Sequence, residues 1–148
     1  LRSIGWAVMG VDGGATGPLF GTFFMSMADA AAGKDAFDAR GLAAAFAAGL
    51  AGVQKRTRAQ VGDKTMLDAL VPAVDAAQAA ADAGGSVKDM LRSASEAARD
   101  GAERTKSLQA RFGRAKNIGE KSIGQPDAGA TSVSLLFKGF LEGVTSHA

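Results

Sequence analysis

The stretch SVKDMLRSASEAARDGAERTKSL, residues 86–108, indicates the fold class of this chain most clearly. Apolar and small residues recur in it at the spacing of a helix face, at Met90, Leu91, Ala94, Ala97, Ala98, Ala102 and Leu108. We therefore predict a helix of about 24 residues that begins at Ser86 and is the longest element of the chain. Its stripe of small residues predicts close packing against neighbouring helices.

The rest of the chain has the same helical character. Alanine is abundant, tyrosine is absent, and Val and Ile do not alternate with polar residues over the length of a strand. Further helices are predicted from Arg2 to about Val11, from a cap at Thr16 to about Ala32, from a cap near Asp38 to the cations at 55–58, from a cap at Asp63 or Thr65 to Gly84, and from Gly129 to about Gly143. The predicted fold is all-α, an antiparallel helical bundle or barrel, in a single domain over residues 1–148.

Composition excludes several classes of function. The 17 basic and 15 acidic residues are interleaved and leave a net charge of +2, so no nucleic-acid partner is implied. The absence of cysteine excludes disulfides, thiolate zinc sites and cysteine nucleophiles, and it fits a cytoplasmic protein. The apolar runs are too short and too rich in glycine to span a bilayer, so no membrane partner is expected.

Two glycine-containing stretches, GGATGP at residues 13–18 and QPDAGA at 125–130, each lead into a predicted helix. The first turn of a helix leaves amide N–H groups unpaired and carries a partial positive charge, so bare backbone there can hold a phosphate. The alternative for each stretch is a plain connection, because glycine is common in turns.

A polar connection of about sixteen residues, from Arg111 to Asp127, separates the last two predicted helices. Ordered loops of this length in a compact domain are often functional, whereas composition alone would favour a solvated linker. Gly113, Gly119 and Gly124 recur along it, and Ile118 and Ile123 are expected to anchor it as apolar contacts.

Four separated segments resemble one known family: GGATGPLFGTFF at 13–24, GDKTMLD at 62–68, GRA at 113–115 and SIGQPDAGATS at 122–132. In order and spacing they are similar to the nucleotide-binding L subunits (DhaL) of dihydroxyacetone kinases, over nearly the whole chain. The resemblance implies a barrel of eight antiparallel helices with the nucleotide at one end. About six of those helices are expected in this chain.

The resemblance also implies a metal site that we do not find in the sequence. In the family, aspartates in an upstream segment hold magnesium ions against the diphosphate. This chain begins at Leu1, without Met and inside an apolar periodic segment. The N-terminal metal-binding helices are therefore expected to be missing from it, with the Mg²⁺ ligands before Leu1. No metal ligand and no catalytic residue is assigned within residues 1–148.

The resemblance implies ADP or ATP as the cofactor, with phosphate contacts at the first glycine stretch and at a loop arginine. Thr16 could equally be only a helix cap, and Arg114 only a solvated charge. At the nucleoside end, Asp127 could be a helix cap and Met66 ordinary core. Lys64 is left out because lysines beside a helix start are usually solvated, and His147, near the end of the chain, is expected to lie in a frayed tail. The expected nucleotide ligands are Gly14, Ala15, Thr16, Thr57, Met66, Arg114, Asp127, Ala128 and Gly129.

Two of these positions depart from the family pattern: Thr57 stands where glycine is frequent, and Ala128 stands where proline is usual. The run IGEKSIG at 118–124 is similar to subunits served by the bacterial phosphotransferase system. The resemblance then implies a kinase subunit whose bound ADP is recharged by a phosphohistidine subunit (DhaM). Its phosphoryl group would pass to dihydroxyacetone on the K subunit (DhaK).

Other functions stay open. The chain could be a metal-free DhaL-like module that binds a partner such as a kinase subunit or a transcription regulator. It could also belong to an ATP-dependent kinase of another small ketose or polyol, or serve a structural duty only.

Overall fold

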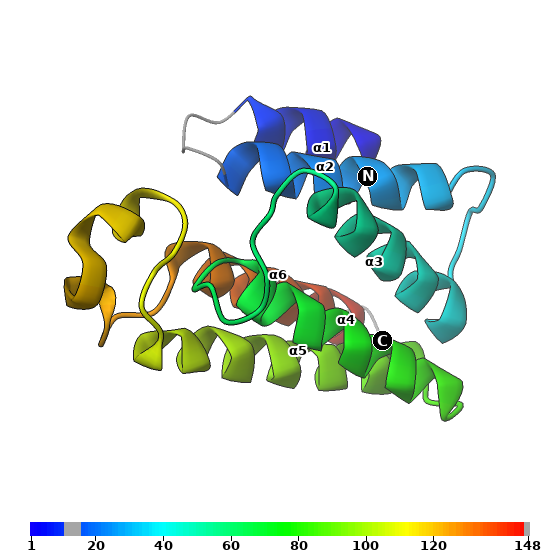
Figure 1. Ribbon diagram of the computed structural model, residues 1–148. Helices are drawn as coiled ribbons and strands as arrows, with labels where there is room; N and C mark the ends of the chain where they lie inside the picture. Colours follow the sequence, from blue (N-terminus) through cyan, green and yellow to red (C-terminus); the bar gives the residue numbers. More distant parts are fainter. Residues whose placement is uncertain (11–15, 147–148) are drawn as a thin grey trace. The chain divides into compact units, whose positions relative to one another are not determined.

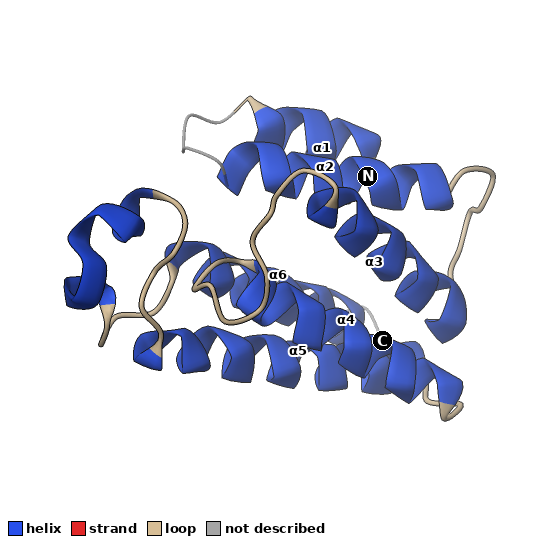
Figure 2. Cartoon of the chain, viewed as in Figure 1, coloured by secondary structure: helices blue, strands red, loops and turns tan. Residues whose placement is uncertain are grey.

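In the computed structural model, which describes residues 1–10 and 16–146, every regular element of the described chain is a helix (Figures 1 and 2). The predicted all-α class is confirmed. The chain divides into two compact units, residues 1–58 and the part from Ala59 onward. Each unit is described by itself below. The single domain expected over residues 1–148 stays a prediction.

The first unit contains three helices, α1 (Arg2–Met9), α2 (Thr16–Ala30) and α3 (Ala39–Gln54). Helices α1 and α2 lie side by side because glycines face each other between them (Figure 1): a Cβ on Gly21 would lie 3.0 Å from the carbonyl oxygen of Gly5. The rings of Phe23 and Phe46 stack 6.3 Å apart between α2 and α3. The predicted cap at Asp38 is confirmed, because its carboxylate accepts a first-turn N–H of α3 at 2.7 Å.

The second unit is built on three α-helices, α4 (Leu67–Asp82), α5 (Val87–Arg104) and α6 (Ala128–Ser146), with α5 packed against both others. The closest approach of α5 to α4 is at Gly101, which was not among the residues of the predicted stripe: any Cβ there would collide with the carbonyl oxygen of Asp68. Helices α4 and α5 therefore meet backbone to backbone. The core of this unit contains Leu67, Leu70, Met90, Leu91, Val133 and Phe137.

Helix α5 begins as predicted and ends earlier than predicted. Ser86 caps it in a capping box with Asp89. The α-helix stops at Arg104 and continues only as a short 3₁₀ turn, η1 (Thr105–Ser107), before Leu108 becomes extended at φ −95° and ψ 145°. The predicted length of about 24 residues was wrong because this end is determined by contacts from a distant part of the unit, described below.

The polar connection is partly helical. It contains a second 3₁₀ element, η2 (Arg114–Ser122), which is broken at Gly119, where φ is +55°. Figure 1 shows η2, in yellow, standing away from the three α-helices of its unit. The expected apolar anchoring was wrong, because Ile118 and Ile123 are 53% and 47% exposed.

None of the helices within residues 1–10 and 16–146 is long and apolar enough to cross a membrane.

Candidate functional site

The loop that leads into α4 is held by the carboxylate of Asp68, which lies in the first turn of that helix. Its Oδ1 accepts the N–H of Gly62 at 2.6 Å, and its Oδ2 accepts the N–H of Thr65 at 2.8 Å. Asp68 is buried, so both oxygens are used inside the protein. Of the two expected caps, Thr65 is supported: its hydroxyl accepts the N–H of Leu67 at 3.2 Å, although the regular helix begins only after Met66. The carboxylate of Asp63 instead accepts the N–H of Gln60 at 2.8 Å.

Lys64, in the middle of that loop, is buried and points into the protein. Only 4% of the residue is exposed, against the expectation of a solvated side chain. Its Nζ donates to the carbonyl oxygens of Thr105 at 2.8 Å, Ser122 at 2.6 Å, Gln125 at 2.7 Å and Leu108 at 3.1 Å. An ammonium has three N–H groups, so one is shared between two oxygens. This charge is compensated by carbonyl dipoles rather than by an acid in direct contact.

The same neighbourhood fixes the start of α6. The N–H of Asp127 donates to the hydroxyl of Thr105 at 2.8 Å, and that hydroxyl donates to the carbonyl of Ala102 at 2.5 Å. The carboxylate of Asp127 then accepts the N–H of Ala130 at 2.8 Å and caps the helix. The cap role considered for Asp127 is therefore present, and α6 begins at Ala128 rather than at the predicted Gly129.

Gly129 brings the start of α6 against the start of α4. A Cβ on Gly129 would lie 3.2 Å from the Cβ of Met66 and 3.1 Å from a carboxylate oxygen of Asp127, which is closer than ordinary packing. The structure thus brings Met66, Asp127, Ala128 and Gly129 together. Met66 is only 4% exposed, so most of its side chain belongs to the core, as the alternative interpretation held.

The Asp127 carboxyl is the electrostatically unusual group of this site. Partial burial raises its pKa above the usual range of an aspartate, because water stabilises the charged form less there. The N–H of Ala130 opposes this effect, and the negative charge of Asp68 adds to it. Perturbed carboxyl groups of this kind are frequent at functional sites.

This geometry limits what the start of α6 can bind. The carboxylate already occupies one free N–H of the helix and places an acidic group at the anion-attracting end. The phosphate role first considered for residues 125–130 is therefore poorly supported. A half-exposed carboxylate is suited to accept hydrogen bonds from hydroxyl or amino groups, which fits the nucleoside end of a nucleotide.

Arg114 is the first residue of η2 and follows Gly113, whose φ of +67° turns the chain outward. Its side chain is exposed and forms no hydrogen bond or ion pair with another residue in the described ranges. The structure does not bring it into contact with the Asp127 group. A guanidinium of this kind remains available to an anionic ligand.

The remaining predicted ligands belong to the first unit. Thr16, the predicted cap of α2, is the first residue of that helix, and Thr57 lies half-buried after α3. Gly14 and Ala15 fall outside the described residues, as does His147. Because the two units are described separately, the part of Thr16 and Thr57 in a shared site stays a prediction.

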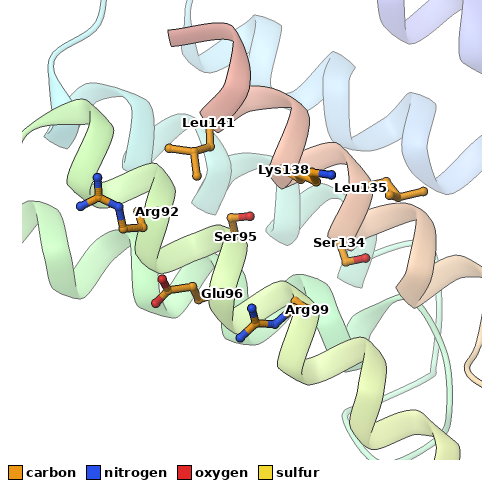
Figure 3. Close-up of a pocket in the computed structure, with 8 residues that line it drawn as sticks. All are labelled: Arg92, Ser95, Glu96, Arg99, Ser134, Leu135, Lys138 and Leu141. Carbon is orange, nitrogen blue, oxygen red and sulfur yellow. The ribbon is translucent and has the colours of Figure 1, made fainter. Parts of the chain in front are cut away.

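A groove of about 460 Å³ lies elsewhere on the second unit, between α5 and α6 (Figure 3). It contains none of the predicted nucleotide ligands. Its cations are each paired with an acidic neighbour on the same helix: Arg92 with Asp89, Arg99 with Asp100 and Lys138 with Glu142. We interpret the groove as a solvated, charge-balanced surface.

Within residues 1–10 and 16–146, no group of three or more His, Asp or Glu side chains is placed to hold a metal ion. The described residues therefore do not fit a magnesium site, and no role below depends on one.

Comparison with known proteins then identifies the family. Residues 1–142 match the model of the DAK2 domain. The chain belongs to the DAK2 domain family. Over 93% of its length it is 41% identical to a protein of Escherichia coli K12 named "PEP-dependent dihydroxyacetone kinase, ADP-binding subunit DhaL", and this match spans 66% of that relative. The expected resemblance to the L subunits is thus confirmed.

Other DAK2 relatives are larger. The chain is 38% identical to an L-erythrulose 1-kinase of Mycolicibacterium smegmatis, over 98% of this chain and 25% of the relative. A crystal structure of the dihydroxyacetone kinase from C. freundii in complex with AMP-PNP and Mg²⁺ matches with a TM-score of 0.65 and 30% identity, over 95% of this chain and 22% of that one. The chain therefore corresponds to part of its relatives, all three of which are named as kinases or kinase subunits.

Sequence reasoning missed the buried polar residues that organise this site. Lys64 lay in the quoted GDKTMLD segment, and no feature of local spacing distinguished it from a surface lysine. Thr105 and Ser122 lay within quoted stretches, but neither was singled out as a site residue, although both are buried in the structure. Their partners lie far away in the sequence, so a reading by helical period could not find them.

Proposed function

We propose that this DAK2 chain is the nucleotide-binding part of a dihydroxyacetone kinase of the type served by the phosphotransferase system, in the cytoplasm. ADP or ATP would be held as a resident coenzyme. The proposed ligands are Gly14, Ala15, Thr16 and Thr57 from the first unit, and Met66, Arg114, Asp127, Ala128 and Gly129 from the second.

The observation that carries this proposal is the start of α6, where a half-exposed carboxylate lies beside bare backbone. Asp127 supplies an acceptor for nucleoside hydroxyl or amino groups, and Gly129 lets Met66 and this carboxylate lie closer to the backbone of α6 than a side chain there would allow. Met66, packed against Gly129, would give this end of the site its apolar floor. The similarity to a named ADP-binding subunit supports the same assignment.

The opposite end of the nucleotide would be met by a cation and by backbone. The exposed guanidinium of Arg114 is suited to two parallel hydrogen bonds with phosphate oxygens. Gly14, Ala15 and Thr16 precede or begin α2, where N–H groups of a helix start favour an anion. The protein then contributes positioning and charge compensation, which is most of what phosphoryl transfer requires.

The bound nucleotide would supply the group-carrying chemistry: a phosphoryl group taken from a phosphohistidine partner subunit (DhaM) and given to a hydroxyl of dihydroxyacetone on a substrate-binding subunit (DhaK). None of the residue roles proposed here depends on a Mg²⁺ ion. Asp127 and Arg114 would keep the nucleotide in place while it first receives the phosphoryl group from one subunit and then gives it to the other.

Calorimetric titration of the purified protein with ADP tests the proposal. We expect binding at one site per chain, and about tenfold weaker binding for Arg114→Ala, because one charge-assisted contact contributes about 1.5 kcal/mol or more. Lys88→Ala is the matched control, since Lys88 is an exposed cation on α5 outside the proposed site. Absence of ADP binding by a folded protein would instead favour a metal-free module that binds a kinase subunit or a regulator.

The acceptor would be tested separately, with the substrate-binding subunit present. We propose dihydroxyacetone because of the similarity to the L subunits. The similarity to an L-erythrulose kinase makes that ketose the comparison substrate. Faster phosphorylation of L-erythrulose would move the assignment to another small ketose and leave the nucleotide site unchanged.

A further inference from the structure

The most unusual residue of the second unit is the buried lysine before α4, and nothing in the proposed mechanism uses it. We infer that Lys64 is a positioning residue for the nucleotide: its ammonium fixes the segment 105–127, which carries Arg114 and Asp127, in the geometry that binds ADP. The identity of the ligand, ADP, rests on the proposed function. The statement that Lys64 fixes the segment 105–127 does not depend on it.

The contacts of the ammonium define which part of the chain it holds. Two of its acceptors, Thr105 and Leu108, lie where α5 ends. The other two are Ser122, the last residue of η2, and Gln125, which lies between η2 and α6. One ammonium thus holds together the two ends of the polar connection, which we call its base. The carbonyl oxygens would face one another without a donor if it were removed, so the base of the connection would open.

The neighbouring hydrogen bonds depend on the same closure. The hydroxyl of Ser122 accepts the N–H of Ala110 at 2.9 Å, and the N–H of Gly124 donates to the carbonyl of Lys106 at 2.7 Å. These bonds join the two ends of the connection directly. The exposed Ile118 and Ile123 add little apolar anchoring, so polar contacts at the base must hold η2 and its arginine.

A direct path leads from Lys64 to Asp127. The carbonyl of Thr105 accepts from the ammonium, and the hydroxyl of the same residue accepts the N–H of Asp127 at 2.8 Å. A shift of Thr105 would therefore move the cap of α6 and its carboxylate. In this inference Lys64 affects nucleotide binding through Thr105 and Asp127, and the ammonium itself does not contact the nucleotide.

The backbone of Lys64 gives independent support. Its φ is +60°, the left-handed region, and it is the one non-glycine residue with positive φ in the described ranges. Lysine has no local advantage in that conformation, whereas glycine or asparagine would adopt it more easily. A lysine there is explained by what its side chain does, because the surrounding contacts must over-determine the conformation.

Hydrogen exchange of the nucleotide-free protein tests the structural half. In Lys64→Met, which keeps the unbranched apolar stem and removes the ammonium, the amides of Gly124 and Asp127 should exchange about tenfold faster or more. The amides in the middle of α5 should change little. Lys88→Met controls for loss of a positive charge, and unchanged exchange at Gly124 and Asp127 in Lys64→Met would overturn the inference.

ADP affinity tests the functional half, with a rescue that general destabilisation would not give. Lys64→Gly relieves the positive φ and leaves a space for an alkylammonium ion. We expect ADP to bind at least about tenfold more weakly and n-butylammonium to restore part of the affinity, whereas neutral n-butanol should not. Leu91→Ala, a core truncation in α5, should lower the melting temperature and leave ADP affinity near that of the natural chain.

Affinity that is unchanged in Lys64→Gly, or restored equally by n-butanol, would overturn the positioning role. If the natural chain binds no ADP at all, the proposed function fails, and the exchange measurement still decides whether Lys64 fixes the segment.

Discussion

The starts of α5 and α6 are capped in similar ways but lie in opposite environments. At α5, Ser86 and Asp89 bond each other in an exposed capping box, and hydrogen bonds from the Ser86 hydroxyl and from its backbone N–H lower the pKa of Asp89. At α6, Asp127 caps the helix from a partly buried position, and burial raises the pKa of its carboxyl. The same residue type is thus stabilised as an anion at one helix start and destabilised at the other.

The difference between these two caps indicates where a ligand site can be sought in a helical protein. The α5 cap is complete within four residues of sequence and needs no other part of the fold. The α6 cap needs Thr105, 22 residues earlier, and through it the ammonium of Lys64. A cap that keeps a carboxyl group in an unfavourable environment is a stronger candidate for ligand binding than one optimised for the helix alone.

Removal of the hydroxyl that supports the α6 cap should have the largest effect on stability and ADP binding, and it tests most directly whether the two helix starts differ. Thr105→Val leaves the N–H of Asp127 without its acceptor, so we expect a free energy of unfolding lower by about 2 kcal/mol and weaker ADP binding. Urea unfolding and ADP titration measure the two effects. A loss no greater than that of Ser86→Ala at α5 would contradict the special dependence of the α6 cap on a distant partner.

Removing the charge at each cap should separate ligand binding from capping. Asp127→Asn keeps a good N-cap residue and removes the anionic acceptor, so we expect about tenfold weaker ADP binding or more with a modest change in stability. The matched control is Asp89→Asn, the same chemical change at the exposed α5 start. Equal ADP affinities for these two variants would remove Asp127 from the proposed site.

Removing the cap hydroxyl at α5 should have a smaller and purely structural effect. Ser86→Ala loses the bond to the N–H of Asp89 at 3.2 Å, and we expect a cost of about 1 kcal/mol in the free energy of unfolding. ADP affinity should stay at the value of the natural chain. A change in affinity would mean that the α5 start communicates with the nucleotide, which no contact described here predicts.

The two carboxyl groups should show opposite dependence on pH, the smallest of these effects. The folded state holds the proton on Asp127 to a higher pH than the unfolded chain does, so its contribution to stability falls as pH rises above the ordinary aspartate pKa of 3.8. Asp89 has a lowered pKa, so its contribution is lost as pH falls below that value. Urea unfolding of the natural chain, Asp127→Asn and Asp89→Asn from about pH 3 to pH 7 would show opposite signs.

Sequence reasoning predicted what is local. The all-α class, the start of α5 at Ser86 and the cap at Asp38 follow from helical period and from capping preferences within a few residues. These features depend on neighbours in sequence, so they could be found without coordinates.

What the sequence did not reveal depends on distant partners. The early end of α5 coincides with Thr105 and Leu108, whose carbonyls bind an ammonium more than forty residues before them in the chain. The same ammonium anchors the polar connection. Ile118 and Ile123 had been expected to anchor it through apolar contacts, but both are exposed. A lysine whose side chain finds four backbone oxygens in a folded unit has no local pattern that distinguishes it from a solvated one.

The position of Lys64 also affects the order in which the second unit can assemble during synthesis. A chain leaves the ribosome from its N-terminal end, and the four oxygens that receive this ammonium follow it by 41, 44, 58 and 61 residues. The loop before α4 therefore emerges with an exposed charge that finds its last oxygen only after Gln125 has been made. A nascent chain halted before that residue should still be open at this corner, accessible to amine-reactive reagents that the completed fold excludes.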